Sequence, residues 1–305
     1  MDERAVATLR CPHCGAQLRR RDRTLTCAAG HHFDLARQGY VNLLAAPSPH
    51  VGDDADMLDR RTATLAAGHF DPLLSALARV VETILEGSRR TRVASRPADD
   101  GSSRQRVRPV DEPYVLVDVG AGTGYQLAHL VGSDAHRVGI AVDVSKHAAR
   151  RAAKAHPRVV AVVADVWTGL PVRGGMADVV LDVFAPRDGA EFARVLAPEG
   201  RVVLVTPTVD HLAELREPLG LLSVDATKAD RVEAALSPHL IALETTPVRW
   251  QLELDHGAVR DLVGMGPIAR HLEPNELERR IAQLPATTPV TGSVLISRHG
   301  HPPPR

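Results

Sequence analysis

All three cysteines of this chain lie within its first 27 residues, where they are spaced as ligands of a metal ion. Cys11 and Cys14 form a C-x2-C pair, Cys27 follows after twelve intervening residues, and His31 after three more. The C-x2-C-x12-C-x3-H pattern is typical of a closed, four-coordinate structural zinc site. A disulfide framework is disfavoured because the cysteine count is odd and no secretory signal precedes the pattern. The sequence therefore predicts that residues 1–45 fold as a small module around one Zn²⁺.

The composition is that of an ordinary globular protein. Its 305 residues suffice for one large domain with a small appendage, and 44% are hydrophobic and 24% charged. No apolar run is long enough to span a bilayer, so we expect a cytoplasmic protein without a membrane partner. The net charge of zero gives no global electrostatic case for binding DNA or RNA.

One local run between the two ligand pairs is basic, and it consists of Arg19, Arg20, Arg21 and Arg23. On a zinc hairpin such a run either faces solvent or contacts the phosphates of RNA. The sequence leaves both interpretations open.

The rest of the chain divides by composition. Residues 46–87 carry an apolar helical stripe, interrupted near Gly68 and Pro72, and we interpret them as a helical connector. Residues 88–113 are rich in Arg, Ser, Pro and Asp, which predicts a disordered insert. From 114 to 305, short apolar strands alternate with amphipathic helices, which predicts an α/β domain with a Rossmann-like sheet. The expected strands are 115–119, 138–142, 159–163, 177–182, 201–206, 240–244, 248–254 and 293–298.

A glycine-rich turn follows the first of these strands and precedes a helix. Its glycines are Gly120, Gly122 and Gly124, and Tyr125 stands where the G-x-G-x-x-G fingerprint of dinucleotide-binding proteins would need a glycine. The G-x-G-x-G form, with Asp118 two residues before it, resembles motif I of the class I S-adenosylmethionine (SAM) methyltransferases. Glycines at such a turn let the backbone approach a ligand closely.

Two further carboxylates follow neighbouring strands. Asp143 ends the second strand, about twenty residues after the turn, where a carboxylate can accept hydrogen bonds from ribose hydroxyls. Asp165 follows the third strand, at a position that in this class often holds the adenine amino group. A plain helix N-cap explains Asp165 equally well. With the glycine-rich turn, these residues predict a SAM site at the carboxyl end of the sheet.

Several segments carry a more specific resemblance. They are the zinc-ligand pattern and the runs 30–44, 68–73, 143–146 and 184–186. Together they resemble the RlmA family of 23S rRNA (guanine-N1)-methyltransferases, over most of the chain. The resemblance implies that Cys11, Cys14, Cys27 and His31 hold the zinc and that the neighbouring His32 does not.

The resemblance also implies cofactor residues and partners. Phe70, Gly124, Tyr125 and His211 match positions that line the SAM pocket in relatives. Those relatives are homodimers that methylate guanine 745 or 748 in a hairpin loop of domain II of 23S rRNA. Similarity to the tylosin-resistance branch of the family favours guanine 748 and resistance to tylosin-like macrolides.

Methylation of guanine N1 requires loss of the proton that N1 carries at neutral pH. Asp182, at the end of the fourth strand, is the nearest carboxylate that could act as the general base. Phe184 and Pro186 follow it, and Phe184 either stacks on the target base or belongs to the core.

Two other functions remain open at this point. The chain could methylate a small molecule or a protein, with no role for the zinc module in substrate binding. Alternatively, the zinc module could bind another protein beside an inactive α/β domain. The intact set of motif residues argues against this last function: Asp118, Gly120, Gly122, Gly124 and Asp143.

Overall fold

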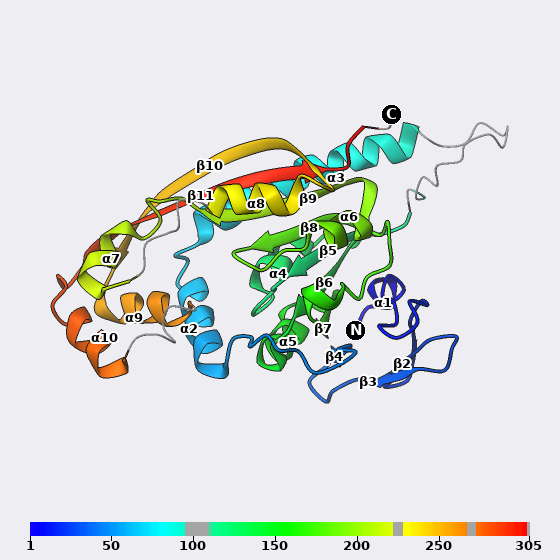
Figure 1. Cartoon of the computed structure of the whole chain (residues 1–305), viewed down its shortest axis with the longest axis horizontal. Helices are drawn as coiled ribbons and strands as arrows, with labels where there is room; N and C mark the ends of the chain where they lie inside the picture. Colours follow the sequence, from blue (N-terminus) through cyan, green and yellow to red (C-terminus); the bar gives the residue numbers. More distant parts are fainter. Residues whose placement is uncertain (95–108, 110, 222–227, 267–272, 304–305) are drawn as a thin grey trace.

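The structure is a computed structural model, and it describes residues 1–94, 109, 111–221, 228–266 and 273–303. At its centre lies an eight-stranded sheet with the order β10-β11-β9-β8-β5-β6-β7-β4 (Figure 1). The strands are β4 (Val41–Asn42), β5 (Tyr114–Val119), β6 (Arg137–Asp143), β7 (Val159–Val163), β8 (Ala177–Val183), β9 (Leu196–Pro207), β10 (Ile241–Leu254) and β11 (Thr288–Gly300).

The strands from β4 to β9 run parallel, whereas β11 and β10 are antiparallel additions at one edge. The parallel strands are rich in valine and almost entirely buried, because helices or the N-terminal module cover both faces. Strand β5 has β6 and β7 on one side and β8 and β9 on the other. Such a reversal of strand order opens a ligand crevice at the carboxyl ends of the strands. This is the class I methyltransferase fold that the sequence predicts.

Alternate side chains of the sheet enter two separate cores. One core packs against α3, α4 and α5, and the other contains residues of α1, α6 and the zinc module. The helices are α1 (Glu3–Val6), α2 (Ala55–Ala66), α3 (Asp71–Ala94), α4 (Tyr125–Val131), α5 (Lys146–Ala155), α6 (Gly189–Val195), α7 (Ala213–Leu219), α8 (Lys228–Leu236), α9 (His256–Gly264) and α10 (Pro274–Ile281). No helix of the described residues is long and apolar enough to cross a membrane.

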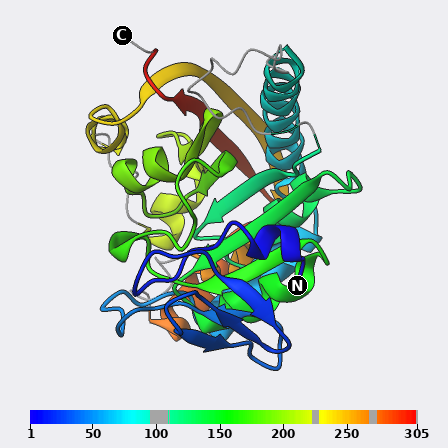
Figure 2. The same cartoon turned by 90° about the vertical axis from the view of Figure 1, so that its right-hand side faces the viewer.

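The N-terminal module is a zinc ribbon that is built into the large domain. Its strands β1 (Arg19–Arg21), β2 (Thr24–Thr26) and β3 (His32–Asp34) form a small antiparallel sheet, and β4 then pairs with β7 at the edge of the large sheet. Figure 2 shows this blue segment lying against the green strands. Leu9, Leu18 and Leu25 belong to the same buried cluster as the sheet residues Val115 and Val160.

Helix α3 corrects the predicted boundary of the disordered insert. It extends through residues 88–94, which the sequence assigned to disorder, and the remaining insert residues 95–108 and 110 lie outside the described residues. The physical reason is a buried ion pair: a guanidinium nitrogen of Arg92 lies 2.5 Å from the carboxylate of Asp178. The Arg92 guanidinium also lies 4.4 Å from the ring centroid of Tyr114. A segment of polar composition can therefore form a packed helix end, which composition alone does not predict.

A second difference concerns the strands expected at 240–244 and 248–254. They form one continuous strand, β10, with Pro247 in its middle. This is possible because β10 is the edge strand of the sheet, where a residue without an N–H costs no ladder hydrogen bond on the open side.

Candidate functional site

The four predicted zinc ligands converge in the ribbon. Their ligand atoms all lie within 4.8 Å of one another. His31 Nδ1 lies 3.5 Å from Cys11 Sγ and 3.4 Å from Cys27 Sγ, and Cys14 Sγ lies 3.6 Å from Cys27 Sγ. A tetrahedron with metal–ligand bonds of about 2.0–2.3 Å has edges of about 3.3–3.8 Å, so this donor set fits Zn²⁺ with His31 binding through Nδ1. Four protein ligands leave no open position, which makes the zinc structural.

The thiol groups differ in how readily they ionise. Burial raises the pKa of Cys11. Burial acts in the same direction on Cys27, but hydrogen bonds from Cys14 and from the backbone of His31 and Ala29 outweigh it and lower the pKa of Cys27 to about 6. A thiol that ionises near neutral pH is prepared to bind a metal ion as thiolate.

The four arginines of the ribbon hairpin fall into two pairs. Arg20 donates to the carbonyl oxygens of Asp22 and Met1, and Arg23 donates to those of Leu35 and Ala36. Arg19 and Arg21 are exposed, and their side chains form no hydrogen bond or ion pair within the described part of the chain.

The strand register explains this division. Arg20 pairs across the ribbon with Leu25, which is buried, so Arg19 and Arg21 project from the opposite face of β1. That face therefore carries two guanidinium groups available to a ligand.

The glycine-rich turn connects β5 to α4 at the switch point. Gly120, Gly122 and Gly124 all adopt positive φ angles, of 69°, 55° and 76°. At Gly120 a Cβ atom would lie 2.5 Å from Cβ of Ala185, so the turn packs directly on the loop that follows β8. Tyr125 begins α4 and packs against the core. Only a residue without a side chain allows these two loops to meet so closely.

Three carboxylates end the neighbouring strands β5, β6 and β8 at this point. They belong to Asp118, Asp143 and Asp182, all largely buried. Burial, with a smaller effect of the other two carboxylates, raises the pKa of Asp118 to about 8. Burial also raises the pKa of Asp143. Burial opposes ionisation of these carboxyl groups, and a nearby cation favours their charged form; the sulfonium of SAM is such a cation.

Asp143 also organises the turn. One carboxylate oxygen accepts from the backbone N–H of Gly122 at 2.9 Å, and the other from that of Ser145 at 2.8 Å. The predicted contact of Asp143 with the ribose therefore requires the remaining lone pairs of the same carboxylate.

Asp165 lies after β7, in a hydrogen-bonded cluster with residues that precede α2. It caps the short 3₁₀ helix η1 (Val166–Thr168) by accepting from the N–H of Trp167, as the N-cap alternative predicts. Its other oxygen accepts from Ser48 at 2.6 Å and lies 2.8 Å from Nδ1 of His50. These contacts lower the pKa of Asp165 in spite of its burial. Its role toward adenine stays a prediction.

Phe184 is the exposed end of a row of four rings. It stacks on His211 with 5.7 Å between ring centroids, His211 lies 6.3 Å from Trp250, and Trp250 meets Phe70 edge-on at 5.8 Å. Phe70 and Trp250 are buried in the core, whereas Phe184 is 41% exposed. The φ of Phe184 is 58°, a left-handed conformation that is strained for a bulky residue. Such strain at an exposed ring is typical of functional sites.

Asp182 holds the loop that carries this ring. It is fully buried, accepts from the N–H of Ala185 at 3.1 Å, and lies 3.3 Å from the guanidinium of Arg187. The carboxylate thus closes the turn between β8 and Pro186. This geometry gives Asp182 a positioning role, and its predicted role as general base stays a prediction.

Sequence reasoning missed two residues of the site. Trp250, in the middle of the ring row, donates from its indole N–H to the carbonyl of His69, and β10 gives no sequence signal of that role. Arg61, on α2, lies against the glycine-rich turn: its Nη1 is 2.7 Å from the position of a Cβ on Gly122. Its only sequence signal is the Arg60-Arg61 pair within the apolar stripe of the connector.

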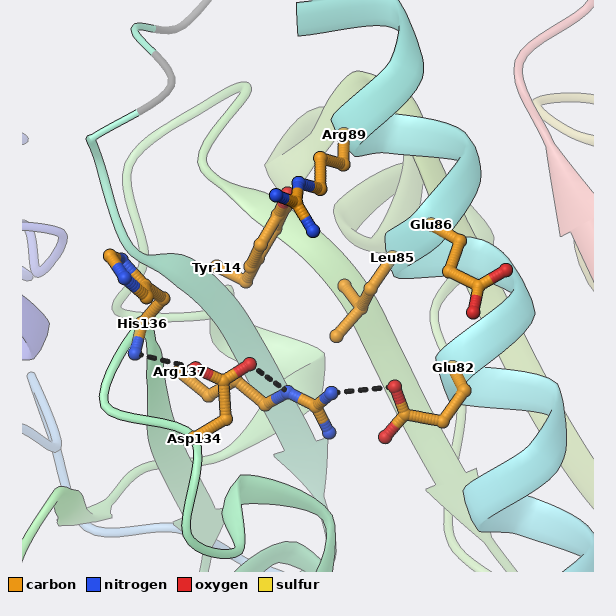
Figure 3. Close-up of a pocket in the computed structure, with 8 residues that line it drawn as sticks. All are labelled: Glu82, Leu85, Glu86, Arg89, Tyr114, Asp134, His136 and Arg137. Carbon is orange, nitrogen blue, oxygen red and sulfur yellow. Dashed lines mark hydrogen bonds and ion pairs between the residues drawn. The ribbon is translucent and has the colours of Figure 1, made fainter.

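A pocket of about 400 Å³ lies away from this site, against α3 and the amino ends of β5 and β6 (Figure 3). Arg137 crosses its floor, with contacts of 2.6 Å to Glu82 and 3.2 Å to Asp134. Three of its charged groups, Glu82, Asp134 and Arg137, are paired with each other, and the pocket is at the wrong end of the strands for the cofactor. We assign no chemistry to it.

The fold and the site define a SAM-dependent methyltransferase with an N-terminal structural zinc ribbon. Family comparisons divide the chain in the same way: the zinc ribbon described as RlmA, N-terminal, matches residues 9–49, and a methyltransferase domain matches residues 117–204.

Three relatives are similar over most of their length. The 23S rRNA (guanine(748)-N(1))-methyltransferase of Streptomyces fradiae is 45% identical over 294 residues, which cover 96% of this chain and 97% of that protein. A protein of Micromonospora griseorubida named for guanine-N1 methylation of 23S rRNA is 46% identical, over 95% of this chain and 96% of its own. YxjB of Bacillus subtilis is 30% identical, over 85% and 86%. The chain belongs to the RlmA family of 23S rRNA (guanine-N1)-methyltransferases.

Proposed function

We propose that this protein transfers the methyl group of SAM to N1 of guanine 748 in a hairpin loop of domain II of 23S rRNA. The observation that carries the proposal is the 45% identity to the guanine-748 enzyme of Streptomyces fradiae, which spans both the ribbon and the methyltransferase domain. Guanine 745, the other target within the family, is the nearest alternative.

The reaction forms a bond between N1 and the methyl carbon, breaks the bond between that carbon and sulfur, and releases the N1 proton. Bound over the glycine-rich turn, SAM supplies an electrophilic methyl group. The residues of this chain then have to hold guanine N1 in line with that group, because positioning supplies much of the rate.

Phe184 is suited to hold the base. Its exposed ring lies in the loop that packs on Gly120, so a base stacked on it is delivered next to the cofactor turn. Pro186 continues the same loop and offers a second apolar surface. A base in a hairpin loop must be splayed out to reach this place, and stacking on an aromatic ring offsets part of that cost.

Asp182 contributes to positioning of the base through the loop that carries Phe184. By accepting from the N–H of Ala185 it fixes the backbone on which Phe184 stands. If Asp182 also takes the N1 proton, the loop must open enough to bring guanine to a carboxylate that is fully buried here.

The zinc ribbon is suited to hold the RNA backbone. Arg19 and Arg21 project together from the exposed face of β1, where they can contact phosphates. Arg20 and Arg23 support the hairpin through their carbonyl contacts, although they too can reach phosphates if the RNA displaces these contacts. We further propose that the protein acts as a cytoplasmic homodimer, as the family resemblance implies.

A reverse-transcription stop map tests the substrate. Methylation of N1 blocks base pairing, so extension should stop one nucleotide before guanine 748 on 23S rRNA from cells that express the gene and not on rRNA from cells that lack it. The same cells should resist tylosin-like macrolides. A stop at guanine 745 would keep the family reaction and reverse the choice of nucleotide. No stop in that loop, with methyl transfer to a small molecule or protein instead, would overturn the proposal.

A further inference from the structure

Arg61 is a cation that lies against the cofactor turn without being part of it. It projects from α2, and its Nη1 lies 2.7 Å from the position of a Cβ on Gly122. Its Nη2 forms an ion pair of 2.7 Å with Asp53 and donates to the carbonyl of Met265 at 3.0 Å. The side chain is 25% exposed, so a ligand over the turn can reach it.

Most of the other ionisable side chains around the turn are acidic, and among these Asp182 is paired with Arg187. Asp118, Asp143 and Asp182 lie near the carboxyl ends of the neighbouring strands, and Asp53 forms an ion pair with Arg61. Arg61 is near enough to Asp143 to counteract the increase in the pKa of that carboxyl caused by burial. The carboxylates of Asp143 and Asp53 suit the sulfonium and the amino group of SAM, but they repel its carboxylate group, whereas Asp118, with a pKa of about 8, is largely protonated at neutral pH. The cofactor therefore needs a cation at this turn.

We propose that the guanidinium of Arg61 binds the carboxylate of the methionine portion of SAM. The planar group of arginine can hold a carboxylate through two parallel hydrogen bonds. The bond to the carbonyl of Met265, at the end of α9, keeps the guanidinium oriented while its contact with Asp53 is exchanged for the ligand. The inference rests on the proposed use of SAM and is independent of the RNA substrate.

The test compares two cofactors that differ only in this carboxylate, SAM and decarboxylated SAM, by calorimetry on the full chain without RNA. Arg61→Ala should weaken binding of SAM by about 10–100-fold, the effect of losing a charged hydrogen-bonded pair. It should change binding of decarboxylated SAM by less than about twofold. Arg61→Lys, which keeps the charge but not the planar group, should fall between wild type and Arg61→Ala for SAM.

Arg60→Ala is the matched control. Arg60 precedes Arg61 on the same helix but pairs with Asp56 and Asp261, so its loss should change neither affinity. Equal weakening of both cofactors by Arg61→Ala would show that Arg61 only supports the turn, and an unchanged SAM affinity would show that the contact is not made. Either result overturns the inference while leaving the methyltransferase reaction in place. Failure of the wild-type protein to bind SAM would overturn both.

Discussion

Among individual side chains, Asp118 is a fully buried carboxyl group with two further carboxyl groups nearby. Burial, with the neighbouring Asp143 and Asp182, raises its pKa from 3.8 to about 8. In the unfolded chain the same carboxyl keeps its usual pKa, so between about pH 4 and pH 8 the folded state holds a proton that the unfolded state has lost. The stability from this group is complete below about pH 4 and is lost as the pH rises through about 8.

Asp118→Asn should remove that pH dependence, because an amide stays neutral. We predict that the cofactor-free variant is more stable than wild type at pH 8, by the order of a few kcal/mol, and nearly equal to it at about pH 4 and below. Urea unfolding over this pH range measures the difference, with Glu253→Gln as a control for loss of an exposed carboxylate. A difference that does not vary with pH would contradict the assignment.

Phe184 permits a test that separates the ring from the backbone. Phe184→Ala should lower kcat/KM for RNA methylation by about 10–100-fold, since stacking on one base is worth about 1–3 kcal/mol, and should leave SAM affinity unchanged. Phe184→Gly should lose the same activity but be about 1 kcal/mol more stable than Phe184→Ala, because its φ of 58° suits glycine. Full methylation activity in either variant would show that Phe184 does not hold the target base and serves only in packing.

The division of the arginines of the ribbon hairpin into two pairs leads to a prediction about one face of strand β1. Replacing both Arg19 and Arg21 with alanine should weaken RNA binding and reduce the salt dependence of log K by about 1.4–1.8, the loss expected for two phosphate contacts. Replacing Arg20 and Arg23 should mainly lower the stability of the ribbon, because their guanidinium groups hold backbone carbonyls. Filter binding over a range of salt concentrations tells the two pairs apart. Equal slopes for both double variants would reject the division of the faces.

An element could be predicted from the sequence when the residues that determine it lie within the element itself. The zinc ligands and the strand–glycine–helix unit are fixed by spacing, so the sequence alone placed them. The end of α3 depended on a partner 86 residues away, Asp178, and a polar segment gave no sign of that pairing. Strand β10 passed through Pro247 only because the sheet places it at the edge. The contact of Arg61 with the turn likewise arises from the packing of α2 beside the switch point.

The zinc ribbon and the methyltransferase domain are joined by strand pairing, side-chain contacts and a shared core. Strand β4 extends the large sheet, and Leu9 of the ribbon forms an isolated bridge with Val172. Arg10 donates to the carbonyl of Leu170 and lies 3.6 Å from the carboxylate of Glu191. Because the ribbon shares its buried cluster with one face of the sheet, loss of its zinc should destabilise the whole chain.

We therefore predict a single cooperative thermal transition that depends on zinc. Free zinc at a thousand times its dissociation constant stabilises a folded protein by about 4 kcal/mol, which for a chain of this size corresponds to a Tm about 6 °C higher than in the metal-free protein. Calorimetry with and without a chelator measures the shift, and added Zn²⁺ should restore the Tm of wild type but not that of Cys27→Ser. SAM affinity should fall with the same treatment, since β7 pairs with the ribbon strand β4 and also with β6, which carries Asp143, the predicted ribose ligand. A separate low-temperature transition for the ribbon, with the main transition and SAM binding unchanged, would show that the two parts fold independently.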